Sequence, residues 1–267
     1  MTVNLQLTPR EFEDKIVVIT GGSAGLGLQI ASAYAKSGAT LHIIDINPTD
    51  AAAEYIKGLG AKASFYQCDI TKEKEVVDAI KQVSAKAEGK IDVLVNNAAI
   101  NGIYQLFKDM PLEGWKRTLD VNLTGPMMVT RECIPLLIAN GSGAIVNISS
   151  NCGKRGLPIR GDYVCSKWAL IGMTQTLAYE LVDDKIRVNA VCPGPIEGDR
   201  IEQVMEMHQE IEGVEHKKIR EDWEAAAPMK RFVTPQEVSN QVLFLSSTYS
   251  SCMTGQTMNA TGGFIMD

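Results

Sequence analysis

Short apolar runs of strand length alternate along this chain with longer segments of helical period, and no other feature constrains the fold as strongly. The strand-length runs are Lys15–Thr20, Thr40–Asp45, Ala63–Cys68, Ile91–Asn96, Gly143–Ile148, Ile186–Cys192 and Gln256–Asn259. The helical segments are Leu26–Ser37, Ala51–Leu59, Lys72–Ala87, Leu112–Val121, Pro126–Ala139, Tyr163–Leu181 and Pro235–Leu245. Alternation at this spacing implies right-handed crossovers between parallel strands that helices cover on both faces. We therefore predict an α/β fold with a doubly wound parallel sheet of about seven strands.

The length and apolar content of the chain fit one domain. There are 267 residues, of which 45% are hydrophobic, and this is enough to bury one large core. Residues 195–228 depart from the alternation, because they are polar, rich in Glu and Met, and include Trp223. Inserted segments of this length often act as lids over active sites. We predict a single domain over residues 1–267 with a helical substrate flap at 195–228; a surface excursion without a role is the alternative.

The net charge and the cysteine pattern limit the classes of binding partner and the cellular compartment that we expect. The net charge of −6 does not favour nucleic acid or an anionic membrane as a partner. The polar segment Met1–Asp14 lacks the apolar core of a signal peptide, and no apolar run approaches the length of a membrane span. The six cysteines are scattered, and none of the three histidines has ligand spacing with a cysteine. We expect reduced thiols, a cytoplasmic protein, no bound metal and a small-molecule substrate.

A glycine-rich turn follows the first predicted strand and leads into a helix. Its sequence is Thr20-Gly21-Gly22-Ser23-Ala24-Gly25-Leu26-Gly27. Glycines allow a sharp turn and a close approach to a pyrophosphate, and the helix N-terminus supplies free N–H groups. Because the turn lies inside the first βαβ unit, it predicts a Rossmann-type dinucleotide site. The expected cofactor contacts in the turn are Gly21, Ser23, Ala24, Gly25, Leu26 and Gly27.

A carboxylate at the end of the second predicted strand indicates which dinucleotide binds. Asp45 would accept hydrogen bonds from ribose hydroxyls and repel a 2′-phosphate. No cation offsets this charge, since position 24 is alanine and position 46 is isoleucine. We therefore expect NAD rather than NADP, with Asp45 and Ile46 among the cofactor contacts. A carboxylate that caps the turn before Asn47 is the alternative.

Two further strand ends carry polar or small residues. Asp69-Ile70 ends the third predicted strand, and Asn96-Asn97-Ala98-Ala99 ends the fourth. A carboxylate at 69 could reach the adenine amino group, and small residues after the fourth strand would let a cofactor lie over the sheet edge. We expect Asp69, Ile70 and Asn97 to contact the cofactor. Turn-forming Asp and Asn side chains are the commoner alternative.

A tyrosine and a lysine four residues apart supply the candidate chemistry. Tyr163 and Lys167 begin a predicted helix, where this spacing places both on one face. A lysine cation beside a phenol stabilises the phenolate. Tyr163 can then take a proton from an alcohol while a hydride leaves for a nicotinamide, or donate a proton to a carbonyl in the reverse direction. A hydroxyl such as that of Ser150 can hydrogen-bond the developing oxyanion.

Taken together, these motifs resemble the short-chain dehydrogenase/reductase family. The resemblance extends from Lys15 to the C-terminus and rests on Thr20–Gly27, Asn96–Ala98, Asn122 within Val121–Gly125, Ser150, Tyr163 with Lys167, and Pro193-Gly194. It implies that the catalytic residues are Asn122, Ser150, Tyr163 and Lys167. Ser150 is preferred to Ser149 because the family's serine lies thirteen residues before its tyrosine.

The resemblance also implies individual roles and an assembly. Asn122 would hold a water that links Lys167 to solvent, Lys167 would bind the nicotinamide ribose, and Ile196 would contact the carboxamide. A homotetramer is expected. Two positions depart from the family's pattern: Gly198 stands where many relatives have threonine, and Asn259–Gly263 replaces the usual Val-Asp-Gly-Gly. The first removes a carboxamide hydrogen bond, and the second alters possible subunit contacts.

The loop before Tyr163 suggests a class of substrate. It carries Lys154, Arg155 and Arg160 in a chain of negative net charge. In the similar 3-hydroxybutyrate dehydrogenases, a lysine at the place of Arg160 grips the substrate carboxylate, and a polar residue at the place of Asn101 also contacts substrate. A guanidinium can bind a carboxylate or sulfonate through two hydrogen bonds. We predict a small anionic hydroxy compound that contacts Asn101, Ser150, Arg160 and Tyr163; an ion pair between Arg160 and Asp162 or another carboxylate is the alternative.

Other functions fit parts of the pattern. A polyol, sugar or hydroxysteroid dehydrogenase of the same family would use the same catalytic residues. An enoyl reductase would usually have six residues, not three, between its tyrosine and lysine. A catalytically silent NAD-binding regulatory protein would predict a broken catalytic set, whereas Asn122, Ser150, Tyr163 and Lys167 are all present.

Overall fold

The computed structural model describes residues 11–266 and contains one seven-stranded sheet. Its strands are β1 (Ile16–Thr20), β2 (Thr40–Asp45), β3 (Ala63–Gln67), β4 (Val93–Asn96), β5 (Gly143–Ile148), β6 (Ile186–Pro193) and β7 (Thr257–Ala260). The strand order is β3-β2-β1-β4-β5-β6-β7, and all neighbouring pairs are parallel. The predicted doubly wound sheet is confirmed. Most of the N-terminal segment 1–14, and Asp267, lie outside the described residues.

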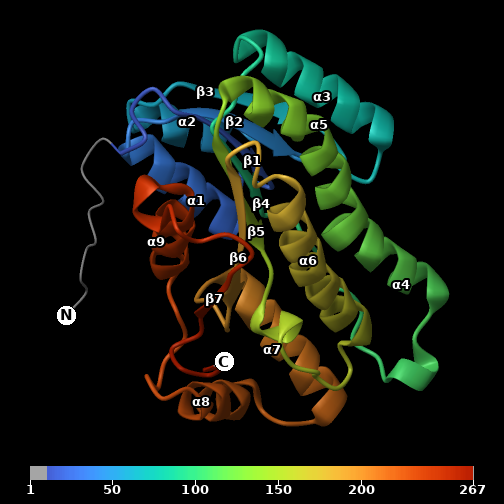
Figure 1. Ribbon diagram of the computed structural model, residues 1–267. Coiled ribbons are helices and arrows are strands. Elements are labelled where there is room, and N and C mark those ends of the chain that lie inside the picture. Colours follow the sequence, from blue (N-terminus) through green and yellow to red (C-terminus); the bar gives the residue numbers. More distant parts are fainter. Residues whose placement is uncertain (1–10, 267) are drawn as a thin grey trace.

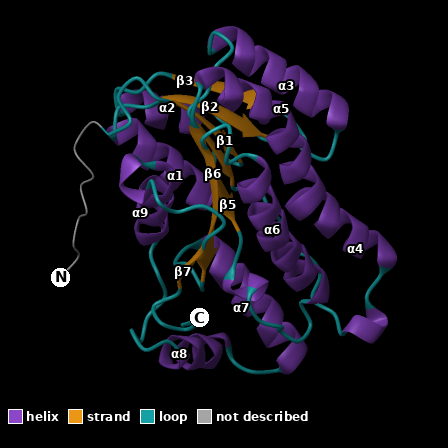
Figure 2. Ribbon diagram, in the orientation of Figure 1, coloured by secondary structure: helices purple, strands orange, loops and turns teal. Residues whose placement is uncertain are grey.

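Helices cover both faces of the sheet (Figures 1 and 2). One face packs against α1 (Gly25–Lys36), α2 (Asp50–Gly58) and α9 (Pro235–Ser246), and the other against α3 (Glu73–Lys86), α5 (Gly125–Asn140) and α6 (Gly161–Glu180). Within β1, Val17 and Ile19 enter the first core and Val18 the second. Successive strand residues point to opposite faces, which explains why the strands are apolar at almost every position. No helix in residues 11–266 is both long and apolar enough to cross a membrane.

Strands are added outward in opposite directions from β1 and β4, so a crevice forms at the carboxyl ends of these two neighbours. Polar side chains fix this edge. Thr20 Oγ1 accepts hydrogen bonds from the backbone N–H groups of Asn97 (3.0 Å) and Ala98 (3.1 Å), which joins β1 to β4. Asn96 Nδ2 donates to Asn147 Oδ1 at 2.8 Å, which joins β4 to β5. The loops that leave these strands are thereby held in register.

The segment predicted as a flap forms two helices, α7 (Asp199–Glu212) and α8 (His216–Ala226). They lie at the end of the molecule beyond β7 (Figure 1) and share a small core with Phe232. Arg220 of α8 donates to Glu197 and to Glu202, each at 2.7 Å, and these bonds pin α8 to the start of α7. The helical prediction for residues 195–228 is confirmed, while their action as a lid stays a prediction.

Most predicted boundaries differ from the observed ones by one or two residues, and two of these differences have a visible cause. The helix expected over Leu112–Val121 ends as α4 (Leu112–Leu119), because residues Asp120–Thr124 form a wider π-helical turn before α5. Such a turn inserts a residue into the helical repeat and is not visible as a change of apolar period. The fourth strand begins at Val93 rather than at Ile91, whose N–H is directed to the carbonyl of Leu136 in α5.

Candidate active site

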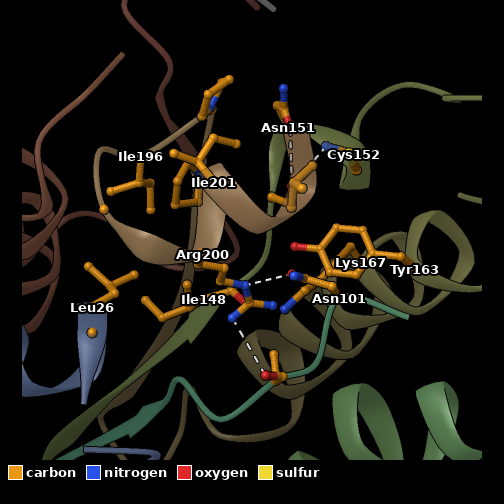
Figure 3. Close-up of a pocket in the computed structure, with 18 of the residues that line it drawn as sticks. Leu26, Asn101, Ile148, Asn151, Cys152, Tyr163, Lys167, Ile196, Arg200 and Ile201 are labelled. Carbon is orange, nitrogen blue, oxygen red and sulfur yellow. Dashed lines mark hydrogen bonds between the residues drawn. The ribbon is translucent and has the colours of Figure 1, made fainter. Parts of the chain in front are cut away.

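One cavity of about 760 Å³ extends along the carboxyl ends of β1, β4, β5 and β6 and reaches the flap. Its wall brings together the predicted site residues Ala24, Gly25, Leu26, Gly27, Asn97, Asn101, Ser150, Arg160, Tyr163, Lys167 and Ile196. In Figure 3, Leu26 and Ile196 lie on one side of the cavity, and Tyr163 and Lys167 lie on the other. The remaining predicted site residues do not line the cavity: Gly21, Ser23, Asp45, Ile46, Asp69, Ile70 and Asn122.

The glycine turn has the shape of a phosphate cradle. A Cβ on Gly27 would lie 1.9 Å from the carbonyl oxygen of Gly21, so no other residue fits there. Helix α1 begins at Gly25 after Ala24, which offers no capping side chain to the first N–H groups. The buried Ser23 Oγ has no hydrogen-bond partner among residues 11–266. Free N–H groups at a helix N-terminus and an unpaired hydroxyl suit a dinucleotide pyrophosphate.

Asp45 lies beside this cradle at the end of β2. Its Oδ2 accepts a hydrogen bond from the backbone N–H of Ser23 at 2.9 Å, and its Oδ1 accepts one from Asn47 at 3.0 Å. The second bond is the turn contact considered above as an alternative, and the first ties the carboxylate to the glycine turn. A carboxylate oxygen can accept more than one hydrogen bond, so ribose hydroxyls could still bind. The Ile46 side chain is half exposed next to it.

Three other predicted cofactor contacts, Asp69, Ile70 and Asn97, form hydrogen bonds or pack within the protein itself. Asp69 Oδ1 accepts hydrogen bonds from the backbone N–H and the hydroxyl of Thr71, which is a turn contact. The Ile70 side chain is buried in the core, so it could reach a cofactor only through its backbone. Asn97 Nδ2 donates to the carbonyls of Thr20 and Gly21 at 3.0 and 2.9 Å and so supports the glycine turn from β4.

Tyr163, Lys167 and Ser150 meet at the inner part of the cavity. Tyr163 lies in the first turn of α6, and its hydroxyl points into the cavity (Figure 3). The Nζ of Lys167 lies 5.7 Å from the centre of the Tyr163 ring. Ser150 Oγ bonds within its own loop, to Asn151 Oδ1 and the backbone N–H of Cys152. Ser149 Oγ instead donates to the Lys167 carbonyl at 3.0 Å, which anchors α6 to β5. The two serines therefore have different contacts.

Lys167 is almost completely buried, with 2% of its surface exposed. Its Nζ donates to the backbone carbonyl of Ile148 at 2.8 Å. Burial lowers the pKa of Lys167 from 10.5 to about 7, and the positive charge of Arg200 contributes to the same shift. A lysine in this range can gain or lose a proton near neutral pH, which is a property expected of a group in a proton relay.

Asn122 lies on the π-helical turn behind Lys167. Its side chain exchanges two hydrogen bonds with the backbone of Ile100, at 2.8 and 3.1 Å, and donates to Ser166 Oγ at 3.1 Å. These bonds attach the loop after β4 to the helix that carries Tyr163. The side chain of Asn122 thus holds the site together, and its role with a water stays a prediction.

Arg160 is buried at the substrate end of the cavity, with 4% of its surface exposed. Its Nη1 donates to Tyr104 Oη at 3.1 Å, and its Nη2 donates to the backbone carbonyl of Asn101 at 2.9 Å. Within residues 11–266, it forms no ion pair with Asp162, whose carboxylate accepts from Thr118 Oγ1 and from the N–H groups of Ile103 and Tyr163. Arg160 therefore faces the cavity without a carboxylate partner in the described chain.

Three residues of this region were not singled out from the sequence. Arg200 donates from Nε to Asn101 Oδ1 at 2.7 Å and lies in the middle of the cavity in Figure 3. His208 lines the cavity from α7, and Tyr104 contacts Arg160 from a loop. One signal could have revealed His208, because it continues the buried helical stripe of Ile201 and Val204 at spacings of seven and four. Arg200 and Tyr104 carry no such signal.

Comparisons with known proteins agree with this geometry. Residues 21–265 match the family described as enoyl-(acyl carrier protein) reductase. The chain is 37% identical to a 3-oxoacyl-[acyl-carrier-protein] reductase, FabG, of Thermotoga maritima, over 95% of this chain and 99% of that protein.

Solved structures also match over nearly the full length of both chains. An NAD⁺-bound xylitol dehydrogenase superimposes with a TM-score of 0.92 and 31% identity, over 95% of this chain and 100% of that one. An actinorhodin polyketide ketoreductase variant with NADPH gives a TM-score of 0.89 and 30% identity, over 94% and 97%. The protein belongs to the short-chain dehydrogenase/reductase family.

As a short-chain dehydrogenase/reductase, the protein is an oxidoreductase with the sheet and cavity described above. Its relatives include both reductases and dehydrogenases, and their structures hold NAD⁺ in one case and NADPH in another. Family membership therefore establishes the reaction class at the level of an oxidoreductase. Cofactor preference and substrate depend on residues particular to this short-chain dehydrogenase/reductase.

Proposed function

We propose that this protein interconverts an alcohol and its carbonyl compound with NAD as the hydride carrier and Tyr163 as the acid/base. One observation carries the proposal. A single cavity is lined at one end by the glycine turn, residues 24–27, and at the other by Ser150, Tyr163 and Lys167. A dinucleotide held at the turn would extend toward Tyr163, where an alcohol could meet both groups.

The residues of this cavity can divide the proton chemistry between them. When bound, NAD accepts the hydride from the alcohol carbon. Tyr163 takes the hydroxyl proton of the substrate, and a cationic Lys167 stabilises the resulting phenolate. Ser150 hydrogen-bonds the substrate oxygen as charge develops on it. In the reverse direction Tyr163 returns the proton to the carbonyl oxygen.

Asp45 supports the preference for NAD. Its carboxylate is fixed by the N–H groups of Ser23 and Asn47 and cannot swing away from the ribose side of the cradle without losing both bonds. A 2′-phosphate placed there would meet a negative charge. Because the relatives include structures with NAD⁺ and with NADPH, this residue rather than the family is the basis of the proposal.

Arg160 supports an anionic substrate, either a hydroxy carboxylate or a hydroxyalkyl sulfonate. Its guanidinium stacks on the Tyr163 ring, and its Nε has no hydrogen-bond partner in the described part of the chain. A buried guanidinium without a carboxylate partner is costly, and a substrate anion would relieve that cost. The test is reduction of NAD, followed at 340 nm, across hydroxy acids, hydroxy sulfonates, polyols and steroids. Oxidation of neutral alcohols alone would contradict the anionic substrate.

A second candidate is reduction of a 3-oxoacyl thioester, which the 37% identity to the Thermotoga maritima reductase favours. The same catalytic residues would serve, since the reaction is again between a carbonyl and an alcohol. Oxidation of NADH by acetoacetyl-coenzyme A, faster than any oxidation in the panel, would select this function. Reduction of crotonyl-coenzyme A would instead indicate an enoyl reductase, a reaction that the Tyr163–Lys167 spacing does not favour.

The quaternary structure and the compartment remain parts of the proposal. Large apolar side chains are exposed on α4, α5 and α6, among them Leu112, Met127 and Trp168, and a homotetramer would cover such surfaces. All six cysteines are free thiols, which suits a reducing cytoplasm. Native mass spectrometry checks the tetramer, and a monomer would contradict it.

A further inference from the structure

A row of side chains in contact with one another connects the flap to Tyr163. The ring of His208 on α7 meets the ring of Tyr104 edge-on, with 5.9 Å between centroids. The Cζ of Arg160 lies 4.4 Å from the Tyr104 centroid and 4.6 Å from that of Tyr163. His208 therefore belongs to the substrate end of the cavity, although it lies forty-five positions after Tyr163 in the sequence.

His208 is buried in this row and contacts side chains of both flap helices. Only 6% of its surface is exposed, and Trp223 of α8 meets its ring edge-on at 5.1 Å. Its Nδ1 lies 2.9 Å from Glu212 Oε1, one helical turn further along α7. A carboxylate accepts and cannot donate, so Nδ1 carries the proton of the neutral ring and Nε2 presents a lone pair. In the neutral ring, the contact with Glu212 thus makes Nε2 a hydrogen-bond acceptor.

The Nε2 atom of His208 is buried, and residues 11–266 offer it no hydrogen-bond partner. The same holds in these residues for the Nε atom of Arg160, and both side chains line the one cavity. Buried polar atoms are paired in most folded proteins, and leaving one unpaired is destabilising. The cavity therefore presents a cationic donor at Arg160, which contacts both Tyr104 and Tyr163, and an unpaired ring nitrogen at His208, beyond Tyr104.

We propose that His208 is a specificity-determining residue that accepts a hydrogen bond from a second hydroxyl of the substrate. The substrate would then be a polyhydroxylated anion: its anionic group meets Arg160, its reacting hydroxyl meets Tyr163, and a further hydroxyl meets His208. Glu212 is the positioning residue that fixes the tautomer of His208. This inference rests on the proposed function and narrows its substrate class.

Two pairs of compounds that differ by one hydroxyl test the proposal. They are 3-hydroxybutyrate with 3,4-dihydroxybutyrate, and 2-hydroxypropane-1-sulfonate with 2,3-dihydroxypropane-1-sulfonate. In at least one pair, the wild-type kcat/KM should be about tenfold higher for the dihydroxy member, as expected for one buried hydrogen bond. The variant His208→Phe should bring the ratio of that pair close to one. His208→Gln, whose amide oxygen can accept a hydrogen bond, should restore part of the ratio.

A matched control uses another histidine of the flap. His216 lies at the start of α8 with about a third of its side chain exposed, and His216→Phe should keep the wild-type ratio. Stabilisation by NAD in a thermal-shift assay should be the same in all four proteins, which shows that the variants fold and bind cofactor.

Two results would overturn the inference in distinguishable ways. If the wild type has the same kcat/KM for both members of each pair, His208 does not bind a second hydroxyl. The same conclusion follows if His208→Phe lowers kcat/KM equally for both members. In either case the proposed function stands. If no anion of the four is oxidised while the neutral xylitol is, the anionic substrate of the proposed function fails as well.

Discussion

The guanidinium of Arg160 lies against the ring of Tyr163, with 4.6 Å between Cζ and the ring centroid. The ring of Tyr104 covers its other side at 4.4 Å. The cation is therefore held in a slot between two phenols, and its Nη atoms bond to Tyr104 and Asn101. A fixed cation beside the proton-transferring residue would orient an anionic substrate with its hydroxyl toward that residue, since a guanidinium fork binds a carboxylate in one plane.

Replacement of Arg160 should affect anionic substrates selectively. Arg160→Ala should lower kcat/KM for the best hydroxy acid or hydroxy sulfonate about 10- to 150-fold, the range for a hydrogen bond to a charged group. Oxidation of a neutral alcohol such as butan-2-ol should change much less. The variant Tyr104→Phe, which loses only the hydroxyl that accepts from Arg160, is the control and should lose at most about tenfold. If Arg160→Ala keeps the wild-type kcat/KM for the anionic substrate, Arg160 does not bind that substrate.

Tyr163 should be needed for chemistry and not for cofactor binding. In Tyr163→Phe the ring that Arg160 and Lys167 approach remains, while the proton-transferring hydroxyl is lost. We expect kcat to fall about 10²- to 10⁴-fold, the usual contribution of a general acid/base, and the thermal stabilisation by NAD to persist. A variant with wild-type kcat would contradict the acid/base role. A wild type that binds NAD but oxidises no compound of the panel would instead support a regulatory protein.

The buried Lys167 should make the free energy of unfolding depend on pH between about 7 and 10.5. Burial lowers its pKa from 10.5 to about 7. Between these two values the unfolded chain binds more protons at this lysine than the folded one, so the free energy of unfolding should rise with pH over this window and level off outside it. Lys167→Met should lack this contribution. Urea unfolding of the cofactor-free protein at fixed concentration, from pH 6.5 to 9.5, measures the difference between the two proteins. A difference that is constant with pH would show that the pKa of Lys167 is not lowered.

Asp45 should control the choice between NAD and NADP. Asp45→Asn keeps a side-chain oxygen that can accept from the Ser23 N–H but removes the negative charge. The KM for NADP should then fall about tenfold or more, because a 2′-phosphate no longer meets a carboxylate. Adding Ile46→Arg at the half-exposed neighbouring position supplies a cation, and it should lower the KM for NADP further. Ile46→Gln is the uncharged control. Equal NADP kinetics in wild type and Asp45→Asn would contradict the role given to this carboxylate.

Several elements could be predicted almost to the residue because their sequence signals are local. The runs Thr40–Asp45 and Gly143–Ile148 have the bounds of β2 and β5, since each is bounded by turn residues and fills both cores of the sheet. The helix after Pro111 was predicted two residues too long, because the π-helical turn at Asp120–Thr124 is stabilised by tertiary contacts of Asn122 with Ile100 and Ser166. A local period cannot reveal such contacts.

The sequence by itself determined the order of strands and helices, the glycine turn and the pairing of Tyr163 with Lys167, because each depends on residues within one helical turn or one strand–helix junction. Only the tertiary structure decided what surrounds that pair. It placed Arg160 between Tyr104 and Tyr163, left Arg160 unpaired with Asp162 in the described chain, and brought His208 from a helix of the flap to the same cavity. These contacts join segments far apart in the chain, and their geometry is set by how the loops pack over the sheet edge rather than by any local pattern.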